Sequence, residues 1–399
     1  MQYKTRFSIF FVALILVHLA TNFVHPVTPT IIQELNLPDY MFGLALAAMQ
    51  LANFLMSPFW GKVNLYISSR QSLLFCCFAY GLAQIGFAYS TTQGAILLAR
   101  VLAGVFAGGI MVSLLTYVVN MAKPEDQGKF LTYSATFHSV SGAFGYLVGG
   151  LVGEYSIRAT FVLQAVIMGI AGILFRCFCL PDAKTDQTLP PRQLVKDANP
   201  LKAFHDGKYF MNTAFALLFA LNVLMNLGNT GFDQVFNYYL KDQLNLTSSY
   251  NGIIKAAVGL LAFVSNMTLC IWIIRKTNIK ISLVVLTSVC TLAAIGTVAS
   301  PNIGFFIFCS IGLYAGYSVS IPVVQHTVAA QADPSQKNLV MGFYNGTKSL
   351  GSIIGSLLSG FLYAIHVKLP FFCIVLVYGM AIAAAAGYWA YCTKKAKVS

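Results

Sequence analysis

The chain has 399 residues, of which 57% are hydrophobic and only 9% are charged. This composition excludes an ordinary soluble domain, in which about a quarter of the residues are charged. The net charge of +13 falls mainly on the joints between apolar runs, where it indicates membrane orientation and not a nucleic-acid surface. The sequence contains no phosphate-cradling glycine loop, metal-ligand cluster or paired carboxylates, so we expect no enzyme, cofactor, metal or nucleic-acid partner.

Twelve apolar runs are each long enough to cross about 30 Å of hydrocarbon as a helix. The predicted spans are residues 8–31, 40–60, 72–89, 95–121, 130–152 and 159–180, followed by 210–240, 250–273, 281–300, 303–328, 339–365 and 369–391. We therefore predict an all-α integral membrane protein with twelve transmembrane helices. The first run is too long for a signal peptide and should remain as an anchor. Pro26, Pro29 and Pro322 are expected to kink their helices.

The distribution of basic residues predicts the orientation of the chain. With both termini in the cytoplasm, 19 of the 25 Lys and Arg residues lie on the inner side, three lie outside and three lie within spans. This asymmetry fits the positive-inside rule for an even number of crossings. We expect a multi-pass protein of a plasma (inner) membrane, and the short loops favour a bacterial source.

The two halves of the chain resemble each other. Leu35 to Leu37, with Gly43 after them, match Leu244 to Leu246 and Gly252 at an offset of 209 residues, and residues 141–150 match residues 351–360 at an offset of 210. Such matches predict two pseudo-symmetric six-helix halves, residues 1–180 and 209–399, joined by a cytoplasmic linker at residues 181–208. In transporters built this way, substrate binds near the membrane midplane between the halves.

A polar stripe runs along the span at residues 210–240. Its members follow one another at steps of four, three, four and four, which places them on one helix face, and they are Asn222, Asn226, Asn229, Asp233 and Asn237. Such a stripe must face protein or a water-filled cavity. Asp233 is the only carboxylate within a predicted span. Burial favours its neutral form and water favours the carboxylate, so we predict that Asp233 couples transport to protons; the alternative is a fixed ion pair with Lys255.

The first span carries a parallel stripe of His18, Asn22, His25 and Pro29, at steps of four, three and four. By the repeat, His25 lies close to the counterpart of Asp233. Because histidine titrates near neutral pH, we predict that His18 and His25 take part in proton coupling. The alternative is that each is a structural histidine.

Apart from Arg176, which is counted with the inner side at the end of its span, the charges within the predicted spans are Arg100, Lys255 and Lys348 against Asp233, an excess of +2. If the lysines face the cavity, this balance favours neutral, zwitterionic or anionic substrates. Aromatic residues suit amphipathic ligands, although they also serve ordinary packing. The predicted cavity residues are Asn22, Asn222, Asn226, Asn229, Lys348, Tyr314, Tyr317 and Phe236.

Several short motifs are similar to those of the major facilitator superfamily, and within it to the twelve-span drug:proton antiporters. Span 4 carries Arg100 and Gly104, and the turn after span 2 keeps two motif residues, Gly61 and Arg70, but has Leu65 where the family has an aspartate. Span 5 has the glycines of an antiporter motif with Tyr146 in place of a proline, namely Gly145, Gly149 and Gly150. These glycines equally suit close helix packing.

The resemblance implies a proton-coupled secondary transporter of the multidrug-efflux type, which exports small amphipathic molecules by alternating access. Its partners would be a small-molecule substrate, protons and the lipid bilayer, and we expect a monomer. Arg100 would support the conformation of span 4. The alternatives are a dedicated exporter or importer of one anionic metabolite or metal chelator, a facilitator without proton coupling, and a non-transporting membrane sensor or scaffold.

Overall fold

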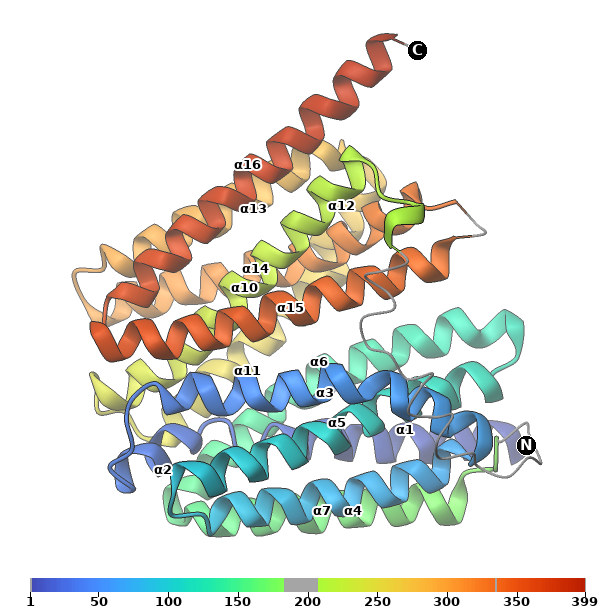
Figure 1. The fold of residues 1–399 in the computed structure, drawn as a ribbon, viewed down its shortest axis with the longest axis vertical. Coiled ribbons are helices and arrows are strands. Elements are labelled where there is room, and N and C mark those ends of the chain that lie inside the picture. Colours follow the sequence, from blue (N-terminus) through green and yellow to red (C-terminus); the bar gives the residue numbers. More distant parts are fainter. Residues whose placement is uncertain (1, 183–206, 334–335, 399) are drawn as a thin grey trace. The chain divides into compact units, whose positions relative to one another are not determined.

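The computed structural model describes residues 2–182, 207–333 and 336–398, and every regular element of these residues is a helix (Figure 1). The first helices are α1 (Gln2–Thr21), α2 (Thr28–Glu34), α3 (Met41–Tyr66), α4 (Ser69–Ala88), α5 (Gln93–Met121), α6 (Pro124–Tyr155) and α7 (Ile157–Phe178). The later ones are η1 (Gly207–Tyr209), α10 (Thr213–Asp242), α11 (Ser248–Ser265), η2 (Asn266–Cys270), α12 (Ile271–Lys276), α13 (Ile279–Val298), α14 (Ile303–Gln331), α15 (Lys337–Ile365) and α16 (Leu369–Val398). Most of the predicted linker at residues 181–208 lies outside the described residues.

The helices confirm an all-α integral membrane fold. Within the described residues, ten helical segments are long and apolar enough to cross a membrane, and Phe7–Thr21 is a shorter apolar helix. Each of the twelve predicted spans coincides with a helix or with two or three successive helical segments. Several helix ends differ from the predicted bounds by a few residues; in particular, α3 continues to Tyr66 and makes helical most of residues 61–70, the predicted turn after span 2.

Proline breaks the first predicted span into α1 and α2. Pro29 lies in the first turn of α2, where its missing N–H removes no helical hydrogen bond. Side chains satisfy the carbonyls that the end of α1 leaves open: Asn22 Nδ2 donates to His18 O at 2.8 Å, and Gln164 Nε2 donates to Ala20 O at 2.9 Å. Pro322, in contrast, lies inside a continuous α14.

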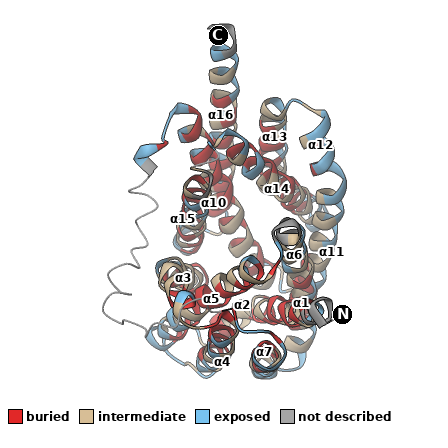
Figure 2. Cartoon of the chain, turned by 90° about the vertical axis from the view of Figure 1, so that its right-hand side faces the viewer, coloured by how far each residue is buried: buried red, intermediate tan, exposed pale blue. Residues whose placement is uncertain are grey.

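The chain forms two compact units. The first comprises residues 1–37, 48–200 and 240–259, and the second comprises residues 38–47, 201–239 and 260–399. Each unit therefore includes a short helical segment from the other half of the sequence. Helices such as α4 and α7 bury one side and expose the other (Figure 2), as expected where a helix packs on neighbours with one face.

In the first unit, α6 crosses α1 with glycine at the contact. A Cβ atom on Gly145 would overlap Leu19 O, and one on Gly149 would overlap Phe23 O. Since only glycine lacks this atom, these positions allow the two backbones to touch. The crossing fixes which side chains of α1 and α6 share a layer.

The second unit repeats this crossing with α10 and α15. A Cβ atom on Gly351 would overlap Val223 O, and one on Gly355 would overlap Leu227 O. These contacts relate α1 to α10 at an offset of 204 residues and α6 to α15 at an offset of 206, about one helical turn from the offset of 210 in the sequence match. At an offset of 204, the position of His25 corresponds to Asn229, and that of Pro29 corresponds to Asp233.

Candidate functional site

A hydrogen-bonded polar layer joins three helices of the second unit. The buried Asn222, on α10, donates through Nδ2 to Tyr344 O at 2.9 Å and to Thr347 Oγ1 at 3.0 Å, both on α15. Asn226 Nδ2 donates to Asn222 O at 2.8 Å and to its Oδ1 at 3.0 Å. From α14, Tyr317 OH donates to Asn226 Oδ1 at 2.8 Å. The amides of the predicted stripe thus face protein, as hydrocarbon surroundings require.

Asp233 lies on the same helix, beside an aromatic cluster. It is half-buried, and Tyr314 OH donates to its Oδ1 at 3.0 Å. The Tyr314 ring packs on Phe232 and Phe236, with ring centroids 5.4 and 5.8 Å away. Phe236 is fully buried and also stacks on Phe306. A ligand would therefore reach Phe236 only after its aromatic neighbours move.

The side of α15 next to α10 offers accessible polar groups. Asn345 and Lys348 are exposed, and Ser352 lies one turn further along the same face, where it accepts a hydrogen bond from Thr230 Oγ1 at 3.1 Å. The Oδ1 atom of Asn229 is buried and has no hydrogen-bond partner among the described residues. These groups give the second unit a face on which a polar ligand group can be bound.

Lys255 and the two predicted proton-coupling histidines, His18 and His25, lie in the first unit. The ring of His25 stacks on Tyr146 with centroids 5.4 Å apart, and Lys255 Nζ lies 5.6 Å from the centroid of the same Tyr146 ring. Lys255 is buried, so this cation lies against the aromatic face in an arrangement that stabilises a buried positive charge. Lys255 and Asp233 belong to different units, and their pairing stays a prediction.

The other polar residues of α1 contact α6. His18 is buried, and the centroids of its ring and of the His138 ring are 4.2 Å apart. Asn22 is half-buried next to Gly142, where a Cβ atom would lie 3.2 Å from Asn22 Nδ2. The predicted stripe therefore faces the neighbouring helix. His138 is more than a hundred residues from His18 in the sequence, so no local pattern identifies it as the partner.

Arg100 is buried and contacts three elements. Its Nη2 donates to Thr28 Oγ1 at 3.2 Å, its Nη1 lies 3.8 Å from Met49 Sδ, and its guanidinium lies 4.1 Å from the centroid of Phe87. A Cβ atom on Gly104 would overlap Met49 O. These contacts hold α5 against α2, α3 and α4, while the role of Arg100 in supporting the conformation of span 4 stays a prediction.

The turn between α3 and α4 takes its carboxylate from a distant segment. Leu65 is exposed, whereas Asp182, which follows α7, is buried at this turn. Asp182 Oδ1 accepts from Ser68 Oγ and Ser69 N, both at 2.7 Å, and its Oδ2 accepts from Ser69 Oγ at 2.6 Å and Asn120 Nδ2 at 3.2 Å. A carboxylate at the N-terminus of α4 also interacts favourably with the helix dipole.

Two motif residues, Gly61 within α3 and Arg70 at the start of α4, have different surroundings. Arg70 Nη1 donates to Cys179 O at 2.9 Å, which ties α4 to the end of α7. A Cβ atom on Gly61 would find its nearest neighbour, Val112 Cγ1, only at 3.9 Å. Packing therefore requires glycine at Gly104, Gly145 and Gly149 but leaves room for a side chain at Gly61.

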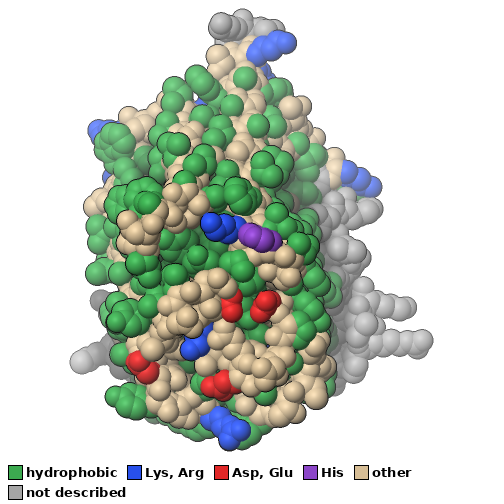
Figure 3. Space-filling model, turned by 90° about the vertical axis from the view of Figure 1, so that its left-hand side faces the viewer, with side chains coloured by type: hydrophobic (Ala, Val, Ile, Leu, Met, Phe, Trp, Pro, Cys, Tyr) green, Lys and Arg blue, Asp and Glu red, His purple; other side chains and the backbone are tan. Residues whose placement is uncertain are grey.

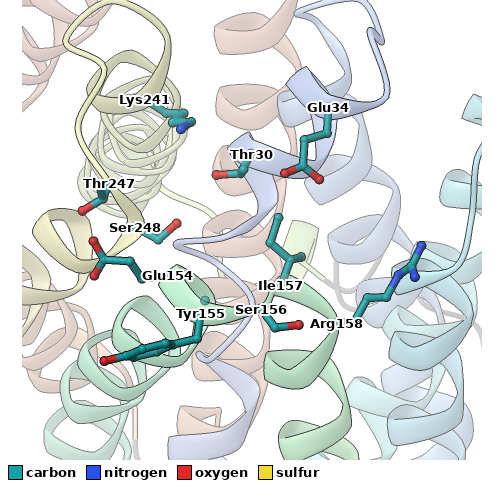
Figure 4. Close-up of a pocket in the computed structure, with 11 residues that line it drawn as sticks. Thr30, Glu34, Glu154, Tyr155, Ser156, Ile157, Arg158, Lys241, Thr247 and Ser248 are labelled. Carbon is teal, nitrogen blue, oxygen red and sulfur yellow. The ribbon is translucent and has the colours of Figure 1, made fainter.

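A cavity of about 420 Å³ lies in the first unit, lined by α2, the end of α6, the start of α7 and residues between 241 and 248 (Figure 4). Its lining includes two carboxylates, Glu34 and Glu154, and two cations, Arg158 and Lys241. The Oγ of Ser249 donates to Glu154 Oε2. None of the predicted cavity residues lines it. Figure 3 shows a molecular face on which acidic and basic side chains lie among hydrophobic ones.

The structure adds residues that the sequence reasoning did not select, above all Tyr344 and Thr347, which receive the hydrogen bonds of Asn222. Together with Gly351 and Gly355 they form a stripe on α15 at steps of three, four and four. This periodicity is visible in the sequence and could have identified the helix face that packs on α10.

Comparison with known proteins establishes the family. The model of the Major Facilitator Superfamily matches residues 10–316. The chain belongs to this superfamily. Its members are membrane transporters and not enzymes, which agrees with the polar layers found within the helices of both units.

Individual relatives match nearly the whole length of this chain. Multidrug resistance protein 2 of Bacillus subtilis (strain 168) is 22% identical over 374 residues, which cover 93% of this chain and 92% of the relative. Quinolone resistance protein NorA of Staphylococcus aureus (strain MSSA476) is 21% identical over 387 residues, which cover 92% of each.

Solved structures share the fold at lower identity. A bacterial homologue of the human lysosomal transporter Spinster, in an inward-facing and occupied conformation, has a TM-score of 0.78 and 11% identity, with 98% of this chain and 97% of the other covered. The nucleoside transporter NupG has a TM-score of 0.77 and 15% identity, with 98% and 99% covered. At these identities the likeness concerns the fold alone.

Proposed function

We propose that this superfamily member is a proton-coupled antiporter that exports small amphipathic molecules by alternating access, as a monomer in an inner membrane with both termini in the cytoplasm. The observation that carries the proposal is the polar face of α10, on which bonded amides lead to a half-buried carboxylate, Asp233, held by Tyr314. Two relatives with drug-resistance names support the choice of substrate class.

Asp233 supplies the proton site in this proposal. As a carboxylate it accepts a hydrogen bond from the Tyr314 hydroxyl. On protonation it loses its charge and gains an O–H donor. Proton binding thus changes both the charge and the hydrogen-bonding capacity of one group on α10. A state open to water favours release of the proton and a closed state favours its retention, which is the cycle that antiport requires.

The substrate would contact the groups of α10, α14 and α15 that lie around this acid. Tyr317, the free Oδ1 of Asn229 and the exposed Asn345 supply hydrogen bonds, while aromatic rings near Tyr314 supply apolar surface. A few placed polar groups among apolar walls are typical of small-molecule sites.

One observation favours a second candidate, a dedicated transporter of one anionic metabolite or metal chelator. Lys348 is exposed on the polar face of α15, within a turn of Asn345 and Ser352. A lysine among hydrogen-bonding groups is suited to a carboxylate or phosphate group. The two candidates differ in substrate breadth and charge.

A flux assay in proteoliposomes under a pH gradient tests the proposal against this alternative. The protein should move several chemically unrelated amphipathic compounds and should change the lumenal pH when any of them is added. Gradient-independent movement of every compound would contradict proton coupling. Transport restricted to one carboxylate compound would replace the multidrug assignment with the dedicated transporter.

A further inference from the structure

His18 and His138 form a close pair of ionisable rings in the described part of the first unit. Their ring centroids are 4.2 Å apart, with the planes tilted by 49°. His18 is only 4% exposed, and its Nδ1 is buried without a hydrogen-bond partner among the described residues. His138 is exposed. A buried imidazole with an open nitrogen therefore lies against an accessible one.

The glycine crossing of α1 and α6 produces this pairing. His138, Gly142, Gly145 and Gly149 follow one another on α6 at steps of four, three and four, and the glycines contact α1 and the residues just after it. The contact of Gly142 with Asn22 is one turn from the contact of His138 with His18. The histidine pair is therefore the next contact along the α1–α6 crossing, and the glycine–backbone contacts determine which residues of the two helices meet.

The second unit has a polar pair in the equivalent layer. At the offsets given by the glycine contacts, 204 for α1 and 206 for α6, His18 corresponds to Asn222 and His138 to Tyr344. Asn222 donates to Tyr344 O across the same kind of crossing. The layer thus makes a polar contact in both units, but only the first unit has two titratable rings there.

We propose that His18 and His138 form one proton-binding site, in which the two imidazoles hold a single proton between them and give the first unit its own coupling group. Two imidazolium ions at this distance would repel each other strongly, so the pair takes up one proton and not two. The proton passes from hydronium to a ring nitrogen of the accessible His138, with release of water. It is then shared with the open nitrogen of His18.

Other charged groups around the pair have different partners. Across the α1–α6 crossing, His138 is the ionisable ring that packs on His18. On α6, Tyr133 packs on Phe11, Tyr146 on His25, and Glu154 accepts from Ser249, while on α7 Arg158 lies over Tyr89. Arg176 and Cys177 are in the last turn of α7. The side chains of Lys4 and Arg6 lie outside the described residues.

The role of the pair in transport rests on the proposed proton antiport, whereas proton binding by the pair does not. Histidine-labelled full-length protein in lipid nanodiscs, followed by NMR as the pH is changed, measures that binding directly. The ring signals of His18 and His138 should titrate together with a total uptake of about one proton. His138→Gln should move the midpoint of His18 by about one pH unit or more, and His18→Gln should do the same to His138.

His366→Gln serves as the matched control, because His366 is exposed at the end of α15 and should leave both midpoints unchanged. Independent titration of the two rings, or two protons taken up together, would overturn the proposal. So would rings that stay neutral between about pH 5 and 8.

Proton-driven flux tests the coupling role separately. His18→Gln and His138→Gln should reduce it to a similar extent, and the double variant should be no worse than either, because they remove one shared unit. Undiminished proton-driven flux in both single variants would overturn the coupling role. Absence of proton-driven flux in the wild type would instead contradict the proposed antiport, and the titration would remain interpretable.

Discussion

The α1–α6 and α10–α15 crossings share a backbone arrangement and differ in chemistry. Both bring glycine against a backbone carbonyl, at Gly145 in the first unit and Gly351 in the second. The polar layer above these contacts holds two imidazoles in the first unit and an amide bonded to a tyrosine carbonyl in the second. The comparison shows that small residues determine the contact, while the side chains two turns away along α6 and α15 are free to diverge.

The crossings also differ beyond the shared layers. At the offset of 204, Asp233 of the second unit corresponds to Pro29 of the first, which lies in the first turn of α2. One unit therefore continues its helix to a titratable acid, and the other breaks its helix before the same point. At the aligned positions of this crossing, a carboxylate stands only in the second unit, and in the first unit we propose that the histidines take its role.

The largest expected loss of stability follows from substitutions that disrupt the glycine contacts of the two crossings. Gly149→Ala and Gly355→Ala should each destabilise the protein by about 3 kcal/mol, the upper end of overpacking costs, because the new Cβ meets backbone. Gly86→Ala and Gly379→Ala, where a Cβ has open space, should stabilise by about 0.5–1 kcal/mol. Thermal unfolding in detergent compares the four; equal effects would contradict the packing argument.

A smaller difference in stability is expected between variants at the N-terminus of α4, in the first unit, and at the N-terminus of α13, in the second. Asp182→Ala leaves several buried donors unpaired and should cost about 2 kcal/mol. Asn278 caps α13 by accepting a hydrogen bond from Lys280 N at 3.1 Å. Its replacement by Ala should destabilise the protein by about 1 kcal/mol. The same unfolding measurement ranks the two, and a larger loss for Asn278→Ala would reverse this interpretation.

Within the polar layer, Asn226→Ala should cost about 1–2 kcal/mol, because it leaves Tyr317 OH without its acceptor in a buried setting. Tyr317→Phe should restore part of that loss in the double variant, since it removes the unpaired hydroxyl. A double-mutant cycle of unfolding free energies measures the coupling. Additive losses would show that the hydrogen bond contributes nothing.

The smallest effect on stability is expected for Lys348→Gln, within about 0.5 kcal/mol, because the side chain is exposed. Its effect on substrates should depend on their charge. Binding of an anionic compound should weaken roughly fivefold, which corresponds to about 1 kcal/mol, while binding of a neutral compound should not change. Titration calorimetry with a matched acid and amide compares them, and equal weakening of both would remove Lys348 from substrate selection.

Hydropathy and charge were sufficient to predict the helices, because about twenty apolar residues specify a span by length alone. The stripe from Asn222 to Asn237 was likewise readable from its helical period. Its partners were harder to identify, because Tyr344 and Thr347 contact it across more than a hundred residues of sequence. Asp182 was missed for the same reason: it lies in a predicted linker, and only the fold brings it to Ser68.

The repeat was recognised from the sequence, but its register was not. Matches near an offset of 210 residues pair Gly145 with Gly355, whereas the helix contacts pair Gly145 with Gly351. Glycines recur every turn on these helices, so a shift by one turn preserves most matches. Only the residues in contact distinguish the two registers, and they decide that His25 corresponds to Asn229.

The central claim is that Asp233 binds the coupling proton, and a comparison of exchange with net flux tests it most directly. In proteoliposomes without a pH gradient, Asp233→Asn should keep substrate-for-substrate exchange, because the amide preserves the acceptor of Tyr314 OH. It should lose gradient-driven substrate flux and the accompanying change in lumenal pH. Asp39→Asn, which alters an acid held by Tyr238 OH at 2.6 Å, should retain both. Full gradient-driven flux and proton movement in Asp233→Asn would contradict the account.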